Sequence, residues 1–165
     1  MNEYVLAKPP STSAYALHRI VAGLTDGAPA LFADRGDHLV VRTTKQLDAD
    51  RRPVREVKGG DVIAFELRAS CGTKNKGRHT YWPVADWKSR HDWLDRQGER
   101  HGFSVITTHC SSGMQLIEKA GRKFTVDRTD FVGVLKVTDS ERFGNAIVKG
   151  IGGKAKAFGF GLIQI

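Results

Sequence analysis

The chain has 165 residues, enough for one domain or two very small ones, and 40% of them are hydrophobic, which is enough to bury a core. Its 26 Lys and Arg outnumber 18 Asp and Glu, and a net charge of +8 favours a polyanion such as nucleic acid as the partner. No apolar run approaches the roughly 18 residues of a membrane span, and the first residues, MNEYVLAKPP, lack the profile of a signal peptide. Cys71 and Cys110 lie far apart with no CxxC, so we expect idle thiols in a cytoplasmic protein, and neither a disulfide framework nor a zinc site.

The first part of the chain predicts the order β-α-β-β-loop-β. Ser11, Thr12 and Ser13 offer N-caps for a helix over Ala14–Leu24. Apolar side chains within it recur at the spacing i, i+3, i+4, i+7 of one helix face. The other expected elements are strands at 4–8, Ala30–Asp34, His38–Thr43 and 61–68, with a loop over 44–60.

The second part predicts β-α-β-β-α-β. We expect a helix that begins after Asp86 and ends near Gly102, and a second that opens at Asp139 or Ser140 and ends before Gly150. The expected strands are 79–84, 103–108, a hairpin of 122–127 and 131–137 that turns at residues 128–130, and 158–165. The fold class is therefore α+β: two tandem ferredoxin-like (RRM-like) domains with antiparallel sheets, at residues 1–70 and 71–165.

Tyr15 and His18 lie one turn apart on the flank of the first helix, about a quarter-turn from its apolar stripe. A phenol and an imidazole placed side by side could both reach one phosphodiester, and histidine can act as acid or base near neutral pH. The same spacing also suits an ordinary surface histidine, and five other histidines compete for this role. No HxH or HExxH spacing indicates a metal site, and we expect no cofactor.

Two basic stretches without acidic residues are candidates for phosphate binding. The first carries Arg68, Lys74, Lys76 and Arg78, and the second carries Arg142, Lys149, Lys154 and Lys156, the last two among the glycines of GIGGKAKAFGFG. Glycines let backbone amides approach an anion closely, although a solvated basic loop would have the same composition. The second stretch follows a helix and opens a strand, so it is neither a P-loop nor a dinucleotide fingerprint.

The segment GIGGKAKAFGFGLIQI resembles the glycine-rich signature of the CRISPR-associated repeat-processing endoribonucleases, in particular the CasE subfamily of Cascade-type complexes. Tyr15-Ala16-Leu17-His18-Arg19 resembles the family's first-helix motif, in which a tyrosine and a histidine serve catalysis. Residues 67–103 and 131–152 resemble the central region and the run into the glycine segment. Together these segments cover most of the chain in the family's order.

The resemblance implies a metal-independent endoribonuclease that cuts CRISPR repeat hairpins in precursor crRNA and leaves 2′,3′-cyclic phosphate and 5′-hydroxyl ends. It implies that His18 is the general acid or base and Tyr15 its companion, with Thr25 the nearest match to a downstream serine or lysine of some relatives. It also implies that a basic β-hairpin holds the repeat hairpin through Arg122, Lys123 and Arg128, and that the enzyme keeps the crRNA beside other Cas subunits of a Cascade-like complex. The full predicted RNA-binding set is Arg19, Lys74, Lys76, Arg78, Arg122, Lys123, Arg128, Lys149, Gly150, Gly152, Lys154, Lys156 and Gly159. A non-catalytic RNA-binding subunit with the same fold is the alternative, and a ribosomal-type RNA-binding domain is a third.

Overall fold

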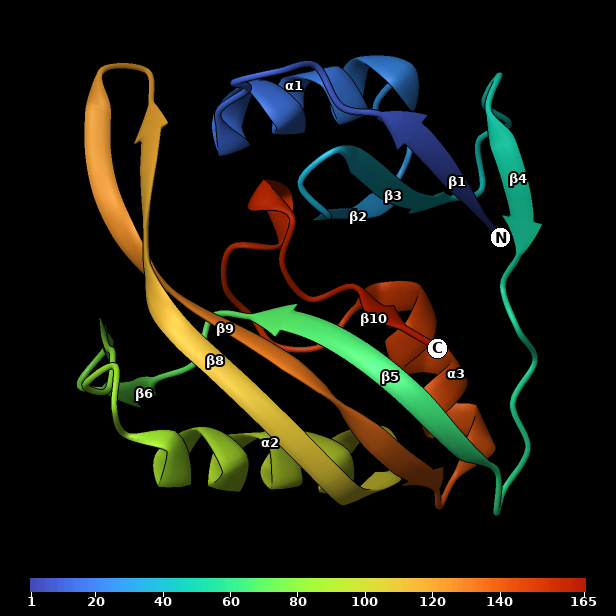
Figure 1. Cartoon of the computed structure of the whole chain (residues 1–165), viewed down its shortest axis with the longest axis vertical. Coiled ribbons are helices and arrows are strands. Elements are labelled where there is room, and N and C mark those ends of the chain that lie inside the picture. The colour runs from blue at the N-terminus through green and yellow to red at the C-terminus, as the bar shows by residue number, and fades with distance from the viewer.

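Two four-stranded antiparallel sheets lie one above the other in the computed structural model, which describes residues 1–165 apart from the side chain of Asn75 (Figure 1). The first sheet has the strand order β2-β3-β1-β4 and the second has the order β10-β5-β9-β8. Both are the ferredoxin-like arrangement, in which the first and third strands of a unit are central. The two-domain α+β architecture expected from the sequence is therefore confirmed.

The first unit is a ferredoxin-like unit that lacks its second helix. Helix α1 packs Leu17 and Val21 against the side chains of Tyr4, Phe32 and Val41 of its sheet. Its elements are β1 (Asn2–Ala7), α1 (Ala14–Leu24), β2 (Ala30–Asp34), β3 (His38–Thr43) and β4 (Asp50–Pro53). Strand β4 lies in the segment that we expected to be a loop; it pairs with β1 at the edge of the sheet, and all four of its residues are exposed.

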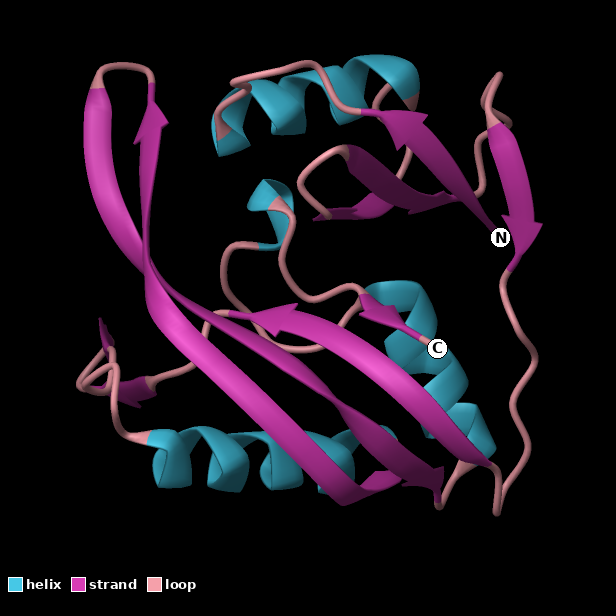
Figure 2. Ribbon diagram, in the orientation of Figure 1, coloured by secondary structure: helices cyan, strands magenta, loops and turns pink.

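The second unit is a complete ferredoxin-like unit with both helices on one face of its sheet (Figure 2). Trp93 and Leu94 of α2 and Phe143 of α3 pack with Phe65 and Phe131 of the sheet in a single core. Its elements are β5 (Val62–Ala69), α2 (Trp87–His101), β8 (Phe103–Lys119), β9 (Arg122–Val137), α3 (Ser140–Lys149) and β10 (Ile163–Gln164). The expected helices are confirmed, with Asp86 and Asp139 as N-caps.

Strand β5 corrects one sequence-based prediction. We expected residues 61–68 to complete the first sheet, but β5 pairs with β9 along its whole length and with β10. Its alternating buried residues face α2 and α3, so the hydrophobic face of the strand is satisfied only in the second sheet. The chain passes from the first sheet to the second within residues 54–61.

The long hairpin formed by β8 and β9 corrects a second prediction. The two strands pair from Phe103↔Val137 to Lys119↔Arg122 with one register shift between Val105 and Thr107, and the turn is Ala120-Gly121. Both turn residues have positive φ, as a two-residue hairpin turn of type I′ requires. The polar residues 128–130, which we expected to be the turn, lie within β9. Thr129 is buried there because it accepts a hydrogen bond from the Arg90 guanidinium.

Two further expected strands are different in the structure. Residues 79–84 do not enter the main sheet; Arg78–Thr80 (β7) instead pairs with Thr73–Asn75 (β6) in a separate small hairpin. Residues 158–165 form a strand only at β10, and a short 3₁₀ helix, η1 (Lys156–Phe158), comes before it. The glycines at 159 and 161 have positive φ, which prevents a continuous strand.

Buried hydrogen bonds join the two units. Arg42 of β3 is 1% exposed and donates to the carbonyl oxygens of Ile147 in α3 (2.6 Å) and Ile163 in β10 (2.8 Å). The same guanidinium pairs with the Glu3 carboxylate. Arg68 of β5 donates to the Asp34 carbonyl at 3.1 Å. These contacts fix α1 and its sheet relative to the second unit.

None of the helices that the structure describes has the length and apolar character needed to cross a lipid bilayer.

Candidate catalytic site and nucleic-acid interface

His18 lies on the flank of α1, where the helix meets the glycine-rich segment. The Ser13 hydroxyl accepts a hydrogen bond from the Ala16 amide and starts the helix, so the register places Tyr15 and His18 on one side. The two ring centroids are 6.3 Å apart. The His18 ring also packs edge-on against Phe158 of η1 at 6.1 Å, and Phe158 in turn packs edge-on against Phe124 of β9 at 5.9 Å. The predicted catalytic pair therefore lies where α1, the glycine-rich segment and the long hairpin meet.

A cavity of about 300 Å³ opens beside His18, and Thr25 and Lys156 also line it. The Thr25 hydroxyl is buried and donates to the Val21 carbonyl at 2.9 Å, so it caps the end of α1. The Lys156 ammonium donates to the carbonyl oxygens of Lys149 (2.8 Å) and Gly150 (2.9 Å) at the end of α3. Both side chains are thus occupied by backbone partners.

The glycine-rich segment turns back on itself against the second sheet. The Ile151 amide donates to the Gly161 carbonyl, and the Gly161 amide donates to the Arg68 carbonyl of β5. Gly161 has φ +84°, and a Cβ there would lie 2.7 Å from the Ile151 carbonyl oxygen. Gly159 has φ +88° and packs against the Phe32 ring. These two glycines serve the fold, which explains part of the glycine content that suggested an anion-binding loop.

The two faces of the long hairpin carry different charges. Lys119 and Arg122 lie opposite each other, on the face that also carries Phe124 and that is turned toward α1. Lys123 lies on the other face and pairs with Glu118 at 3.4 Å. Arg128, in the middle of β9, pairs with Asp130 at 2.9 Å. By strand alternation Arg122 and Arg128 therefore lie on the face of Phe124, although Arg128 is already paired, and only Lys123 lies on the other face. Sequence reasoning missed Lys119 beside Arg122.

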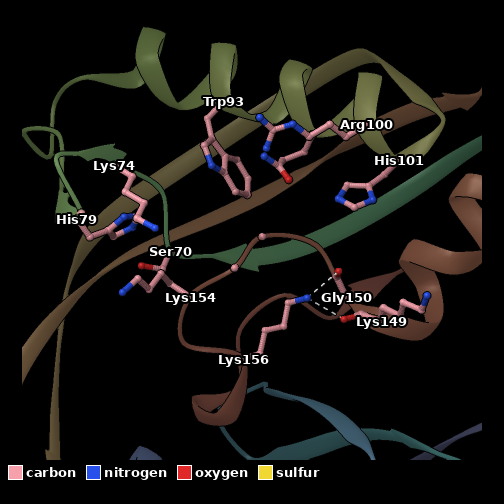
Figure 3. A pocket seen from close by; sticks show the side chains of 14 residues that line it. Ser70, Lys74, His79, Trp93, Arg100, His101, Lys149, Gly150, Lys154 and Lys156 are labelled. Carbon is pink, nitrogen blue, oxygen red and sulfur yellow. Dashed lines mark hydrogen bonds between the residues drawn. The ribbon is translucent and has the colours of Figure 1, made fainter.

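A larger groove, about 780 Å³ in volume, lies between α2, the small β6–β7 hairpin and the glycine-rich segment (Figure 3). Six residues of the predicted RNA-binding set line it together: Lys74, Lys149, Gly150, Gly152, Lys154 and Lys156. The lining residues that sequence reasoning missed include Ser70, His79, Arg100 and His101. Arg100 and His101 end a helix whose other side is buried, so only the tertiary structure shows where they point.

The remaining predicted RNA-binding residues lie outside this groove. Arg19 is exposed on α1, and Lys76 and Arg78 are exposed on the small hairpin. The competing histidines have other surroundings. His38 begins β3 and pairs with the exposed Asp37, His91 contacts the Cys110 sulfur at 3.6 Å, and His109 is exposed.

No group of three or more His, Cys, Asp or Glu side chains that could hold a metal ion is found in the described part of the chain. Burial and the nearby Asp127 carboxylate raise the pKa of the Cys71 thiol, and this keeps the thiol protonated and unreactive.

The family model described as "CRISPR associated protein" matches residues 7–165. The chain belongs to the family of CRISPR-associated proteins. The family resemblance seen in the sequence is thus confirmed. No curated protein matches the chain.

Solved structures of CRISPR-associated proteins share the whole fold. The CRISPR endoribonuclease Cse3 bound to a 19-nucleotide RNA superposes with a TM-score of 0.83 at 22% identity, over 99% of both chains. Thermus thermophilus Cse3, bound to an RNA representing a pre-cleavage complex, gives a TM-score of 0.80 at 21% identity, over 99% of this chain and 97% of that one. Cas6e from Escherichia coli K-12 gives 0.80 at 20% identity, over 99% and 98%. At sequence identities of 20–22%, this structural similarity shows that the chains share a fold.

Proposed function

We propose that this CRISPR-associated protein is an endoribonuclease that cuts CRISPR repeat RNA at a hairpin and keeps the product as a subunit of a Cascade-like complex. The observation that carries the proposal is the position of the Tyr15–His18 pair, between the glycine-rich segment and the cationic face of the long hairpin. Two kinds of solved protein with this fold support it: Cse3 bound to RNA, and components of the "CRISPR RNA-guided surveillance complex".

In the proposed reaction, the 2′-hydroxyl of the nucleotide before the cut attacks the adjacent phosphorus. Its proton passes to a base, the bond to the 5′-oxygen breaks, and that oxygen takes a proton from an acid. The products are a 2′,3′-cyclic phosphate and a 5′-hydroxyl. Histidine suits either proton transfer near neutral pH. His18 is half-buried, and its contacts with Tyr15 and Phe158 fix the direction of the ring.

Tyr15 lies close enough to His18 for one phosphodiester to contact both side chains. Its phenol would donate a hydrogen bond to the phosphate, whose charge Lys119 and Arg122 would balance from the facing hairpin. The proposal assigns no step to a metal ion, so cleavage should proceed undiminished in excess EDTA.

The test is cleavage of a labelled repeat hairpin under single-turnover conditions with excess EDTA. We expect His18→Ala to lower the rate by about 10²–10⁴-fold, the usual range for a lost general acid or base, with little change in hairpin affinity. His109→Ala is the matched control, because this exposed histidine lies outside the proposed site. A substrate with a 2′-deoxy nucleotide before the cut should remain intact. Tight binding without any cleavage by the wild type would indicate a non-catalytic RNA-binding subunit instead.

A further inference from the structure

The groove between α2 and the glycine-rich segment is strongly cationic. It is lined by Lys74, Arg100, Lys149, Lys154 and Lys156, and none of its lining residues is Asp or Glu. Among the described residues, Lys74, Arg100, Lys149 and Lys154 form no ion pair. By contrast, Lys123 and Arg128 of the long hairpin are both paired. Unpaired like charges repel one another, so a bound anion would stabilise this arrangement.

Two buried polar atoms in the groove point to the same conclusion. The Ser70 hydroxyl and the His79 Nε2 atom are buried, and neither has a hydrogen-bond partner among the described residues. Ser70 is only 6% exposed, and both side chains line the groove (Figure 3). Leaving a buried polar group unpaired costs about 1–3 kcal/mol. A bound phosphate would give the hydroxyl an acceptor.

The site does not read bases by stacking. Trp93, the aromatic residue in the groove, is 7% exposed and already lies flat against Phe131, with the centroids 6.1 Å apart. His79 packs edge-on against Tyr81 at 5.2 Å, which fixes its ring. Charge and hydroxyl groups thus dominate the accessible chemistry, and these recognise a sugar–phosphate backbone irrespective of sequence.

The groove adjoins the candidate catalytic site. Lys156 lines both the groove and the cavity beside His18, so the glycine-rich segment is the wall between them. A volume of about 780 Å³ is in the range of small-ligand sites and would hold about two nucleotides, whereas an RNA duplex is far wider. A strand that leaves the catalytic site could therefore cross the glycine-rich segment and enter the groove.

We propose that this groove binds the sugar–phosphate backbone of an unpaired RNA segment that continues from the hairpin at the cut. The inference rests on the proposed function, because it takes the hairpin to be bound at His18. The groove would thus be a second RNA-binding site, built by α2, the small hairpin and the glycine-rich segment. Through it the protein would bind a hairpin with an unpaired extension more tightly than a hairpin alone.

The experiment compares three labelled RNAs: the repeat hairpin alone, the hairpin with about six unpaired nucleotides beyond the cut, and the unpaired oligonucleotide alone. A 2′-deoxy nucleotide before the cut keeps the extended RNA whole. Titrations at several salt concentrations use the wild type, Lys74→Ala/Arg100→Ala and, as a charge-matched control, Lys58→Ala/Lys136→Ala. The altered groove residues lie on β6 and α2, outside the glycine-rich segment, so the fold should tolerate the change.

We expect the wild type to bind the extended RNA more tightly than the hairpin, and Lys74→Ala/Arg100→Ala to lose this advantage. For single strands each phosphate contact contributes about 0.7 to the salt slope, so two lost contacts lower it by about 1.4 and affinity at 0.1 M salt by about 25-fold. Equal losses for both hairpin RNAs, or equal losses in the control, would overturn the proposal. If neither hairpin RNA binds the wild type, the proposed function fails, and binding of the oligonucleotide that depends on Lys74 and Arg100 would still support the groove.

Ser70→Ala separates a ligand role from a structural one. Because the hydroxyl has no protein partner, its loss should leave thermal stability unchanged or higher while it weakens binding of the extended RNA. A variant that loses stability but binds the extended RNA normally would assign Ser70 to the fold alone.

Discussion

Replacing Arg42 by Met should destabilise the protein strongly, because this guanidinium joins the two units from within. The variant keeps the apolar bulk but leaves the Ile147 and Ile163 carbonyl oxygens without their donor. It also removes the cation beside Glu3, whose side chain is 17% exposed. Each orphaned buried acceptor costs about 1–3 kcal/mol, and Glu3 can turn partly to water, so we expect a total of about 3–5 kcal/mol.

In a protein of this size, each kcal/mol shifts Tm by roughly 2–4 °C, so the melting temperature should fall by about 6–20 °C. Circular dichroism during heating and in urea measures this. Arg35→Met is the matched control, because it also removes contacts between the units, to the Glu66 carboxylate and to the Gln164 side-chain oxygen. Glu66 is half-exposed, and such ion pairs are worth at most about 1 kcal/mol, while the Gln164 oxygen is only partly buried and can turn to water. The Glu3→Gln/Arg42→Met double variant should be more stable than the sum of the single changes predicts. A Tm shift for Arg42→Met no larger than that of Arg35→Met would refute the reasoning.

Three further predictions concern the hairpin, the glycines and pH. Lys119→Ala/Arg122→Ala should weaken binding of the repeat hairpin and flatten its salt dependence more than Lys123→Ala does, because Lys123 lies on the other face beside Glu118. Equal losses of affinity and equal salt slopes for the two variants would contradict this prediction. Gly161→Ala should lower the free energy of unfolding in urea by about 2–3 kcal/mol, because φ is +84° and the new Cβ meets the Ile151 carbonyl oxygen. The control is Gly144→Ala, which adds a Cβ in open space on α3 and should stabilise the protein by up to about 1 kcal/mol. If Gly161→Ala left stability unchanged, the segment would be able to rearrange. Burial lowers the pKa of His79, with Lys154 and Lys74 adding to the effect, and burial also lowers the pKa of His101, with Lys156 and Arg100 adding to it. The folded state therefore favours both imidazoles in the neutral form, so the free energy of unfolding should be highest above the unfolded-chain pKa of about 6.5 and should fall as the pH drops below it. Urea melts at pH 7.5 and 5.5 should show a smaller pH dependence for His79→Gln/His101→Gln than for the wild type. An unchanged pH profile in that variant would count against the prediction.

Local signals in the sequence were enough to predict the helices and the first hairpin. The caps at Ser13, Asp86 and Asp139 and the periodic apolar faces act within one or two helical turns, so the helices begin and end close to where the pattern placed them. The Tyr15–His18 neighbourhood follows in the same way, because residues one turn apart on a helix must be neighbours. The resemblance of these segments to known proteins added the family, which no local pattern contains.

Strand partners and buried polar groups were decided only by the tertiary structure. Strand β5 follows the first unit directly, yet its apolar face is buried only against α2 and α3, which come later in the chain. Residues 128–130 have the composition of a turn, but Arg90, far away in the sequence, donates a hydrogen bond to Thr129 and allows β9 to run through. The groove is a third case: Lys74, Arg100 and Lys154 come from three separate segments. These residues come together because the glycine-rich segment folds back onto the second sheet. Backbone hydrogen bonds hold it there, and the pattern of side chains in the sequence does not predict them.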